Sequence, residues 1–157
     1  MRKAQREIKD LHKIRQILDK CDVCRVGLAD GQLPYIVPMN YGYTLEDRNL
    51  TLYFHCALTG RKLEIISRNN LACFEMDCSH QLKTGLQACD YSMNYDSVIG
   101  SGTIGIVSDP AERVLGLNCL MHHYSDRNDW SFDERALALA TVLRLQAGEF
   151  AAKRLAK

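Results

Sequence analysis

The chain has 157 residues, of which 46% are hydrophobic and 25% are charged, a composition typical of a soluble globular protein. This length predicts a single domain over residues 1–157 with enough apolar side chains for its own core. The 20 Lys and Arg residues nearly balance the 19 Asp and Glu residues, so the overall charge favours neither nucleic acid nor membrane partners.

The seven cysteines are the unusual part of this composition. An odd number of cysteines cannot pair completely within one chain. The N-terminal sequence is charged and lacks the apolar stretch of a secretion signal. No segment approaches the ~18 apolar residues of a membrane span. We therefore expect free thiols in the reducing environment of the cytoplasm.

The first half of the chain predicts a helix followed by strands. Apolar residues recur at helical spacing within about residues 5–20, which indicates an amphipathic N-terminal helix. From Cys24 the period changes to two, and Asp30-Gly31 predicts a hairpin turn before a strand over 34–38 that residues 40–43 can extend. A third strand is predicted over residues 50–55, which are good β-formers.

The next predicted elements are a short helix and two strands. The helix covers residues 63–68, with Thr59 or Gly60 as its cap, and a strand over 71–77 follows. Residues 78–96 are polar and show no clear pattern. A fifth strand is predicted over 97–107.

The last predicted elements are a capped helix and a sixth strand. Asp109 as N-cap and Pro110 at the first helical position predict a helix that ends near Tyr124. A helical turn over 132–135 and a long strand over 137–147 complete the prediction. Six strands with added helices indicate a mainly β domain, a β-barrel with α additions.

The cysteines and histidines suggest metal or redox sites only weakly. Cys21 and Cys24 form a C-x-x-C pair, which binds zinc or exchanges thiols in other contexts, but no second pair has suitable spacing. Cys24 and Cys73 fall on predicted strands as core residues, and Cys78 and Cys89 match no common metal spacing. We predict no metal site. A zinc protein using Cys21, Cys24, Cys78 and Cys89 remains a third and weaker alternative.

Residues 53–62 carry the most informative motif of the sequence. A strand ends at His55, a loop with Gly60 follows, and Arg61 and Lys62 stand at the start of a helix. Arginine, lysine and the backbone N–H groups of a helix N-terminus all suit a phosphate. The segment therefore predicts a site for a phosphorylated cofactor, with an ordinary exposed Arg-Lys pair as the alternative.

The order of these motifs resembles the FMN-binding split-barrel superfamily of pyridoxamine 5′-phosphate oxidase, and within it the group of nitroimidazole-resistance (Nim) proteins. The resemblance covers about residues 5–150 and depends on the following stretches: Cys24-Arg-Val-Gly-Leu, Pro34-Tyr-Ile-Val-Pro-Met-Asn-Tyr-Gly-Tyr, Leu52-Tyr-Phe-His-Cys-Ala, Gly60-Arg-Lys-Leu, Cys73-Phe-Glu and Ser97-Val-Ile-Gly-Ser-Gly.

The resemblance implies a six-stranded antiparallel split barrel that binds FMN, with FAD as a possible substitute. It implies that Arg61 and Lys62 hold the flavin phosphate and that His55, Cys56 and Ser97 lie beside the cofactor. The backbone of Pro38, Met39 and Asn40 would line the isoalloxazine ring. It further implies a homodimer whose flavin sites lie at the interface.

The function implied by the resemblance is that of a flavin-dependent oxidoreductase, which could reduce nitroimidazoles or other small nitroaromatic or quinone-like substrates. His55 is then the candidate catalytic residue, either as a proton donor or only packed against the ring, since histidine exchanges protons near neutral pH. Oxidation of vitamin B6 is not expected, because the C-terminal sequence lacks the Arg-x-His type motif of those oxidases. The alternative is a non-enzymatic flavin- or haem-binding module for storage or sensing, with His80, His122 or His123 as a haem ligand.

Overall fold

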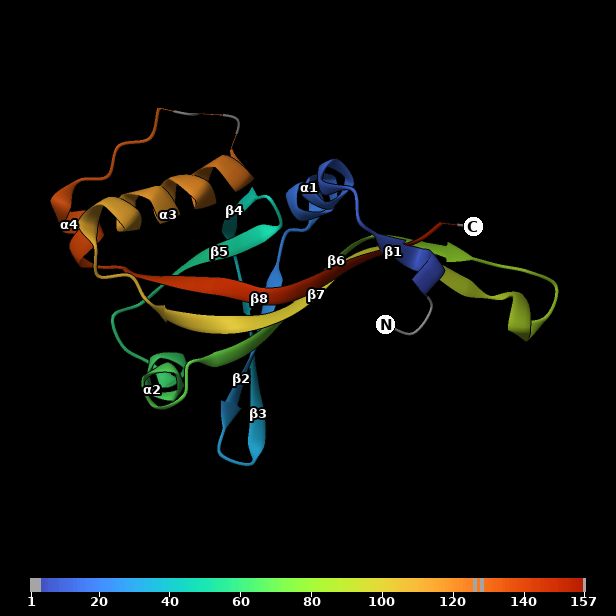
Figure 1. Ribbon diagram of the computed structural model, residues 1–157, viewed down its shortest axis with the longest axis horizontal. Helices are drawn as coiled ribbons and strands as arrows, with labels where there is room; N and C mark the ends of the chain where they lie inside the picture. The colour runs from blue at the N-terminus through green and yellow to red at the C-terminus, as the bar shows by residue number, and fades with distance from the viewer. Residues whose placement is uncertain (1–3, 126, 128, 157) are drawn as a thin grey trace.

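The computed structural model describes residues 4–125, 127 and 129–156 and has the mainly β architecture that the sequence predicts (Figure 1). Its elements are η1 (Ala4–Arg6), β1 (Glu7–Ile8), α1 (Leu11–Lys20), β2 (Cys24–Asp30), β3 (Leu33–Met39), β4 (Gly42–Glu46), β5 (Asn49–Cys56), α2 (Arg61–Arg68), β6 (Leu71–Lys83), η2 (Ala88–Asp90), β7 (Ser92–Ile106), α3 (Pro110–Tyr124), α4 (Glu134–Ala138) and β8 (Thr141–Leu155). Seven strands form one antiparallel path in the order β3-β2-β6-β7-β8-β5-β4, and β1 pairs with β8.

Within the described residues the sheet therefore has eight strands, whereas the sequence pattern predicts six. The first additional strand, β1, has only two residues and pairs with the end of β8, so it is too short to show a periodic pattern. The second arises because the strand path is interrupted at residues 40–41, and β4 pairs with β5 instead of continuing β3. The expected extension of the second strand through residues 40–43 was wrong.

The N-terminal helix is shorter than predicted. The carboxylate of Asp10 accepts a hydrogen bond from the backbone N–H of His12 at 2.9 Å, which caps a helix that begins at Leu11 rather than near residue 5. A short polar side chain satisfies the first N–H groups of a helix and so fixes where it begins. The three buried residues of α1 are Ile14, Ile17 and Leu18, which match the apolar face that the sequence predicts.

Strand β8 differs most from its prediction, because it runs over Thr141–Leu155 instead of 137–147. The first predicted residues belong instead to α4 and the turn after it. At the other end, the pairing with β7 shifts where Gly102 pairs with Ala147 and Ser101 with Glu149, which leaves Gly148 as an extra residue. This β-bulge changes the alternation of inward and outward side chains, so a single period-two pattern cannot span the strand.

Strands β6 and β7 extend beyond the rest of the sheet as a two-stranded arm, which covers residues 79–94 and is green in Figure 1. Residues 80–91 are all exposed, on both faces of the arm. An exposed ribbon needs no alternation of apolar and polar side chains, which explains why this segment shows no pattern in the sequence. At the base of the arm, Arg154 forms a double ion pair with the buried Asp96, with N–O distances of 2.6 and 3.0 Å.

The pKa of Asp96 shows how firmly this base is held. Burial alone would raise the pKa of this carboxyl group. Hydrogen bonds from Arg154 and from Ser79, whose hydroxyl donates at 2.9 Å, outweigh burial and hold the pKa below its usual range. The carboxylate is therefore charged at neutral pH and keeps the arm attached to β8.

The main core fills the inner side of the curved sheet. Alternate residues of β2, β5, β6 and β8 point inward, and α1 and α2 add apolar side chains to this core from its two ends (Figure 1). Its largest fully buried side chains are Tyr41, Phe54, Phe74, Ile14, Ile17, Leu18, Leu45, Leu50, Leu52, Ile65, Met76 and Ile104. A smaller cluster of Tyr53, Val107 and Val142 lies on the other side of β5, beneath α3.

Helix α3 begins where the sequence predicts. Pro110 occupies its first turn, and the Asp109 carboxylate accepts a hydrogen bond from the backbone N–H of Glu112 at 2.8 Å. The helix packs closely on β4 and β5, because a Cβ atom at Gly42 would lie 2.2 Å from the carbonyl carbon of Cys119. Gly42 thus allows two backbones to meet, and this contact sets the position of α3.

We expect Gly42→Ala to lower the free energy of unfolding by about 1–3 kcal/mol, since the added methyl group displaces backbone atoms of α3. The matched control is Gly105→Ala in β7, where a Cβ atom has no neighbour within 4 Å. Urea denaturation of both variants measures the difference. Equal effects of the two substitutions would contradict the close packing of α3 on β4.

Candidate functional site

The end of β5 presents two consecutive candidate residues to different surroundings. Leu52 and Phe54 point into the main core, so Tyr53 and His55 face the side that α3 covers. His55 is exposed there. Cys56 is half-buried and packs against the main core on the opposite face.

His55 lines a pocket of about 370 Å³ beneath the second half of α3. Asn40, from the connection between β3 and β4, is the other polar residue with a short side chain in the lining. The remaining lining residues are Leu117, Leu120, Met121, Tyr124 and Phe132. An apolar pocket with a few polar groups is typical of sites for small molecules and cofactors.

The wall of this pocket is fixed by the C-terminal end of α3. His123 donates a hydrogen bond through Nε2 to the carbonyl oxygen of Cys21 at 2.9 Å, and its ring lies 4.5 Å from that of Tyr41. The Tyr124 hydroxyl donates to the carbonyl oxygen of Asp22 at 2.7 Å and accepts from the backbone N–H of Tyr41 at 3.1 Å. These bonds hold α3 against the segment between α1 and β2.

Arg61 and Lys62 lie at the start of α2, as the sequence predicts. Gly60 precedes them with φ of 139°, a backbone conformation that residues with a Cβ atom rarely adopt. Arg61 donates from Nε and Nη2 to the Asp30 carboxylate at 3.1 and 2.9 Å. The guanidinium also lies 4.8 Å from the ring centre of Tyr35.

Lys62 is half-buried and close to Cys56. Burial raises the pKa of the Cys56 thiol and outweighs the opposing effect of the Lys62 charge. The thiol is therefore protonated at neutral pH. Because His55 and Cys56 are consecutive, the two cations and the pocket beneath α3 lie on either side of the end of β5.

The other predicted site residues are more dispersed. Ser97 is buried on β7, pairs with Lys153 and lines a separate hollow on the outer surface of the sheet. Pro38 is exposed on β3 opposite Arg25, whereas the Met39 side chain is buried in the main core. The chain thus brings together Asn40 with His55, and Cys56 with Lys62, but it does not bring Ser97 to either pair.

The sequence pattern does not identify some residues of the site. It indicates Asp30 only as part of a hairpin turn, because the contact of Asp30 with Arg61 joins positions that are 31 residues apart. Leu117, Met121 and Phe132 were not recognised as pocket residues. The apolar face of a helix is visible in a sequence, but the strand that it covers is not.

The cysteines occupy varied surroundings, and each of the seven is a free thiol. Cys21, Cys24 and Cys78 are buried, while Cys89 is exposed near the end of the arm. The prediction that Cys73 is a core residue was wrong, because its side chain points to the exposed face of β6. Within residues 4–125, 127 and 129–156, no three His, Cys, Asp or Glu side chains gather as a set that could ligate a metal ion.

Two of the three histidines named as candidate haem ligands, His80 and His123, are already engaged through ring nitrogens. His123 uses Nε2 for the carbonyl of Cys21, and His80 places Nε2 2.5 Å from the Asp77 carboxylate. His122 is exposed beside Arg15 and Asp19 in another pocket. Among the described residues, no helix has the length and apolar character needed to cross a membrane.

Comparisons with known proteins extend this description. A search of solved structures finds a candidate 5-nitroimidazole antibiotic resistance protein from Bacteroides thetaiotaomicron, which is 32% identical, with 94% of this chain and 86% of that chain covered and a TM-score of 0.79. The flavocytochrome Anf3 from Azotobacter vinelandii is 17% identical, with coverage of 100% and 72% and a TM-score of 0.80.

A FAD and heme binding protein from Mycobacterium smegmatis is 18% identical, with coverage of 97% and 74% and a TM-score of 0.83. These two more distant similarities support the fold alone. No curated protein matches the sequence. The sequence profile of the pyridoxamine 5′-phosphate oxidase family matches residues 10–154, which is most of the chain. The chain therefore belongs to the pyridoxamine 5′-phosphate oxidase family, with the split-barrel fold that the sequence motifs indicate.

Proposed function

We propose that this protein binds a flavin, FMN in preference to FAD, and uses it as an oxidoreductase. The observation that carries this proposal is the pair of cations at the start of α2, next to the strand end that presents His55 to an apolar pocket. A guanidinium, an ammonium and helix N–H groups suit a phosphate, and the pocket suits a flat ring system. The name of the FAD and heme binding protein from Mycobacterium smegmatis supports the same class of cofactor.

A bound flavin would supply the transfer of electrons or hydride. The residues of this chain would then bind and orient the cofactor. Arg61 and Lys62 would offset the phosphate charge, with Cys56 next to them, whereas Asn40 and His55 would lie beside the ring system and the backbone of Pro38 and Met39 along it. Helix α3 would exclude water from the pocket, because its apolar residues form most of the lining.

One observation favours flavin over haem as the main cofactor, although two relatives are named for haem or cytochrome content. His123 and His80 have ring nitrogens committed to Cys21 and Asp77. The two cations do not separate the candidates, because they suit the propionate groups of haem as well as a flavin phosphate. A haem-binding module for storage or sensing stays as the second candidate, and a Soret band in the absorption spectrum would reveal it.

The flavin proposal predicts a yellow protein, or an apoprotein that binds added FMN. In the double variant Arg61→Ala, Lys62→Ala, the dissociation constant for FMN should rise by about 10- to 100-fold, as expected for charge-assisted hydrogen bonds. Riboflavin, which has no phosphate, should bind with nearly unchanged affinity. Quenching of flavin fluorescence measures both constants.

The control for this experiment is the double variant Lys9→Ala, Lys13→Ala. It removes the same charge from exposed positions at and just before α1, at the opposite end of the core from α2 (Figure 1). The control should bind FMN like the wild type. A protein that stays colourless with added FMN and FAD would overturn the flavin proposal, and unchanged FMN affinity in the first variant would overturn the phosphate assignment.

We further propose that the substrates are small nitro compounds such as nitroimidazoles, or quinone-like molecules. Reduction of a nitro group to a nitroso group takes up two electrons and two protons and releases water. His55 is exposed at the pocket and can donate one of these protons. The 32% identity to a candidate nitroimidazole resistance protein supports this substrate class.

His55→Ala should slow the oxidation of the reduced protein by a nitroimidazole by about 100-fold, the usual contribution of a general acid. Ferricyanide accepts electrons without a proton, so its rate should change less than about twofold. Anaerobic stopped-flow absorbance measures both rates. Equal slowing with both acceptors would mean that His55 only packs against the ring, and no reaction of the wild type with any nitro compound would exclude this substrate class.

We also propose that two chains associate through the outer sheet face, defined here by Ile36, Leu71 and Ile99. These side chains are 65, 62 and 51% exposed, which is unusual for large apolar residues of one sheet. Together with Cys73 and Ser97 they line two adjoining hollows of about 840 and 480 Å³. In such a homodimer, Ser97 of one chain would complete the flavin site of the other.

Cys73 reports on this association, because it is exposed on the outer sheet face of one chain. If two chains cover this face, iodoacetamide should label Cys73 at least tenfold more slowly than the exposed Cys89, which serves as the internal reference. Peptide mapping by mass spectrometry measures both rates. Equally fast labelling in a protein that sediments as a monomer would contradict the dimer.

A cytoplasmic location is also part of the proposal. Seven free thiols favour a reducing compartment, since exposed thiols such as those of Cys73 and Cys89 are readily oxidised elsewhere.

A further inference from the structure

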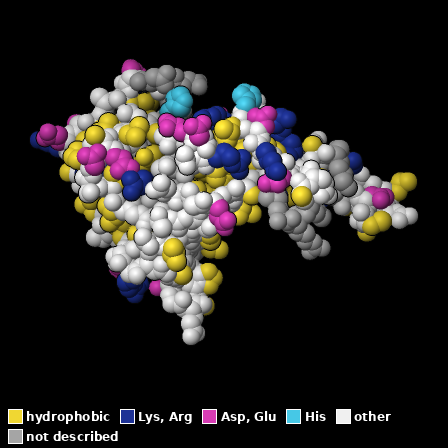
Figure 2. All heavy atoms as spheres, viewed as in Figure 1, with side chains coloured by type: hydrophobic (Ala, Val, Ile, Leu, Met, Phe, Trp, Pro, Cys, Tyr) yellow, Lys and Arg dark blue, Asp and Glu magenta, His cyan; other side chains and the backbone are white. Residues whose placement is uncertain are grey.

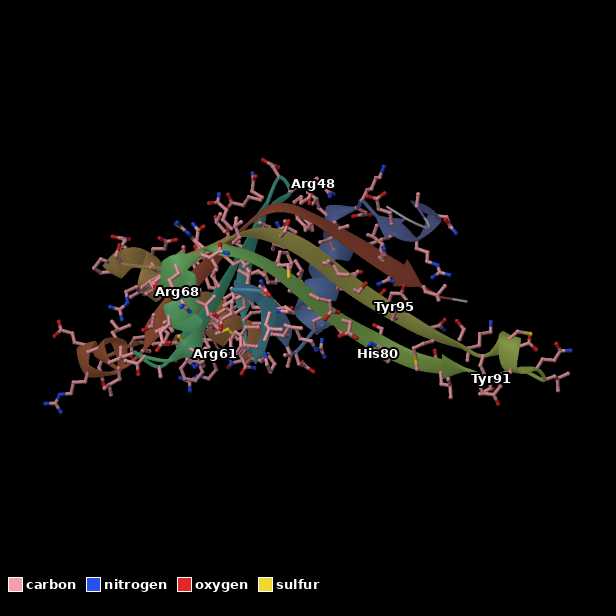
Figure 3. All side chains as sticks on the ribbon, turned by 90° about the horizontal axis from the view of Figure 1, so that it is seen from below. Arg48, Arg61, Arg68, His80, Tyr91 and Tyr95 are labelled. Carbon is pink, nitrogen blue, oxygen red and sulfur yellow. The ribbon has the colours of Figure 1, made fainter. Side chains whose placement is uncertain are left out.

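The carboxylate of Asp30 joins two arginines of α2 that are seven residues apart. Arg61 donates to Oδ2 of Asp30, and Nη2 of Arg68 donates to Oδ1 at 3.3 Å. Residues seven apart lie on the same side of a helix, and Figure 3 shows Arg61 and Arg68 along the same helix. Because each oxygen has its own arginine, the plane of the carboxylate is fixed.

The guanidinium of Arg61 is held from two directions. Its Nε–Nη2 edge faces Asp30, and its central carbon lies over the ring of Tyr35, 4.8 Å from the ring centre. Both partners come from the β2–β3 hairpin, where Asp30 pairs with Leu33 and Gly31 forms the turn. Among the described residues, Nη1 of Arg61 makes no hydrogen bond, so this edge is available to a ligand.

Arg68 also explains why Asp30 does not cancel the attraction for an anion. One carboxylate faces two guanidinium groups, so these three groups keep a net positive charge, to which Lys62 adds another. Arg68 is itself held by a hydrogen bond from Nε to the carbonyl oxygen of Glu64 at 3.1 Å. The carboxylate can therefore orient Arg61 without making the site repel a phosphate.

We propose that Asp30 and Tyr35 are positioning residues, which hold the free edge of Arg61 in the orientation that receives the phosphate of the flavin. This inference rests on the proposed flavin function. The β2–β3 hairpin would then not only reverse the chain but also orient Arg61. A freely rotating arginine would lose side-chain entropy on binding, whereas the oriented one has lost it already.

The test compares the dissociation constants of FMN and riboflavin for the wild type and two variants, Asp30→Ala and Tyr35→Leu. In each variant the constant for FMN should rise about 3- to 10-fold, the cost of ordering one free side chain. The constant for riboflavin should stay within about twofold, because it lacks the phosphate. Asp30→Glu keeps a carboxylate and should fall between the wild type and Asp30→Ala.

The ratio of the dissociation constants of FMN and riboflavin distinguishes a positioning role from a general loss of structure. A loss of structure would weaken the binding of both ligands to the same extent. If Asp30→Ala fails to fold by circular dichroism, Tyr35→Leu and Asp30→Glu carry the test. Asp129→Ala is the matched control, because Asp129 binds Arg127 at 2.9 and 3.1 Å and Arg127 likewise lies over an aromatic ring, that of Trp130. For Asp129→Ala, the ratio of the dissociation constants of FMN and riboflavin should equal that of the wild type.

Each other outcome overturns the inference in a distinguishable way. Tighter FMN binding by Asp30→Ala would show that the carboxylate competes with the phosphate. An unchanged ratio in both hairpin variants would show that the orientation of Arg61 is immaterial. If the wild type binds neither FMN nor riboflavin, the proposed function fails and this inference fails with it.

Discussion

The sharing of β8 between the two parts of the sheet is the constraint on which the rest of the structure depends. Leu143–Gln146 pair with β5 along one edge and with β7 along the other, while Leu143 and Leu145 point into the main core. Strands β4 and β5 belong to the sheet only through this pairing. Because α3 lies on β4 and β5, the pocket beneath α3 also depends on the register of β8.

The last two residues of β5 show how strand geometry divides a site between two environments. Successive side chains of a strand point to opposite faces. His55 therefore meets the apolar lining from α3, and Cys56 meets Lys62 on the other side. A ligand that reached both would have to pass around the end of the strand. The positively charged part of the site, next to Cys56, and its apolar part, next to His55, thus adjoin consecutive residues of the chain. They nevertheless lie on opposite faces of the sheet.

The apolar outer sheet face and the position of Ser97 both bear on whether two chains associate. Several large apolar side chains remain exposed on this face, and Ser97 lies among them rather than near His55. If a second chain covers this face, its association explains both the exposed apolar side chains and the position of Ser97, which would then face the site of the other chain. Figure 2, which shows a single side of the molecule, has Lys, Arg, Asp and Glu side chains of both signs side by side over its upper part, with hydrophobic side chains between them and a few lower down.

Local signals predicted the parts of the fold that local chemistry determines. Asp109 and Pro110 predicted the start of α3, and Asp30-Gly31 predicted the β2–β3 turn, because a cap and a turn each need only a few neighbouring residues. The sequence could not show the length of β8, whose alternation changes at the bulge around Gly148. It also misled about Cys73, since a small residue in a strand suits a buried face and an exposed one equally.

For the candidate site, too, the sequence predicts local features but not contacts between distant segments. His55, Arg61 and Lys62 were identified because strand, loop and helix follow one another in the chain. The contact of Asp30 with Arg61 needs the hairpin and α2 to meet, which is a property of the folded sheet and not of either segment. Likewise, the pocket lining from α3 is defined only once Gly42 lets the helix approach β4.

The attachment of α3 to the segment before β2 has a consequence for how the sequence can vary. His123 and Tyr124 donate to the main-chain carbonyls of Cys21 and Asp22, not to their side chains. Every amino acid supplies that acceptor, so the exposed Asp22 can be exchanged while the bond persists. Selection at this contact therefore acts on one partner alone. Related sequences would show constraint at positions 123 and 124 without any compensating change at position 22, and covariation would not reveal the contact.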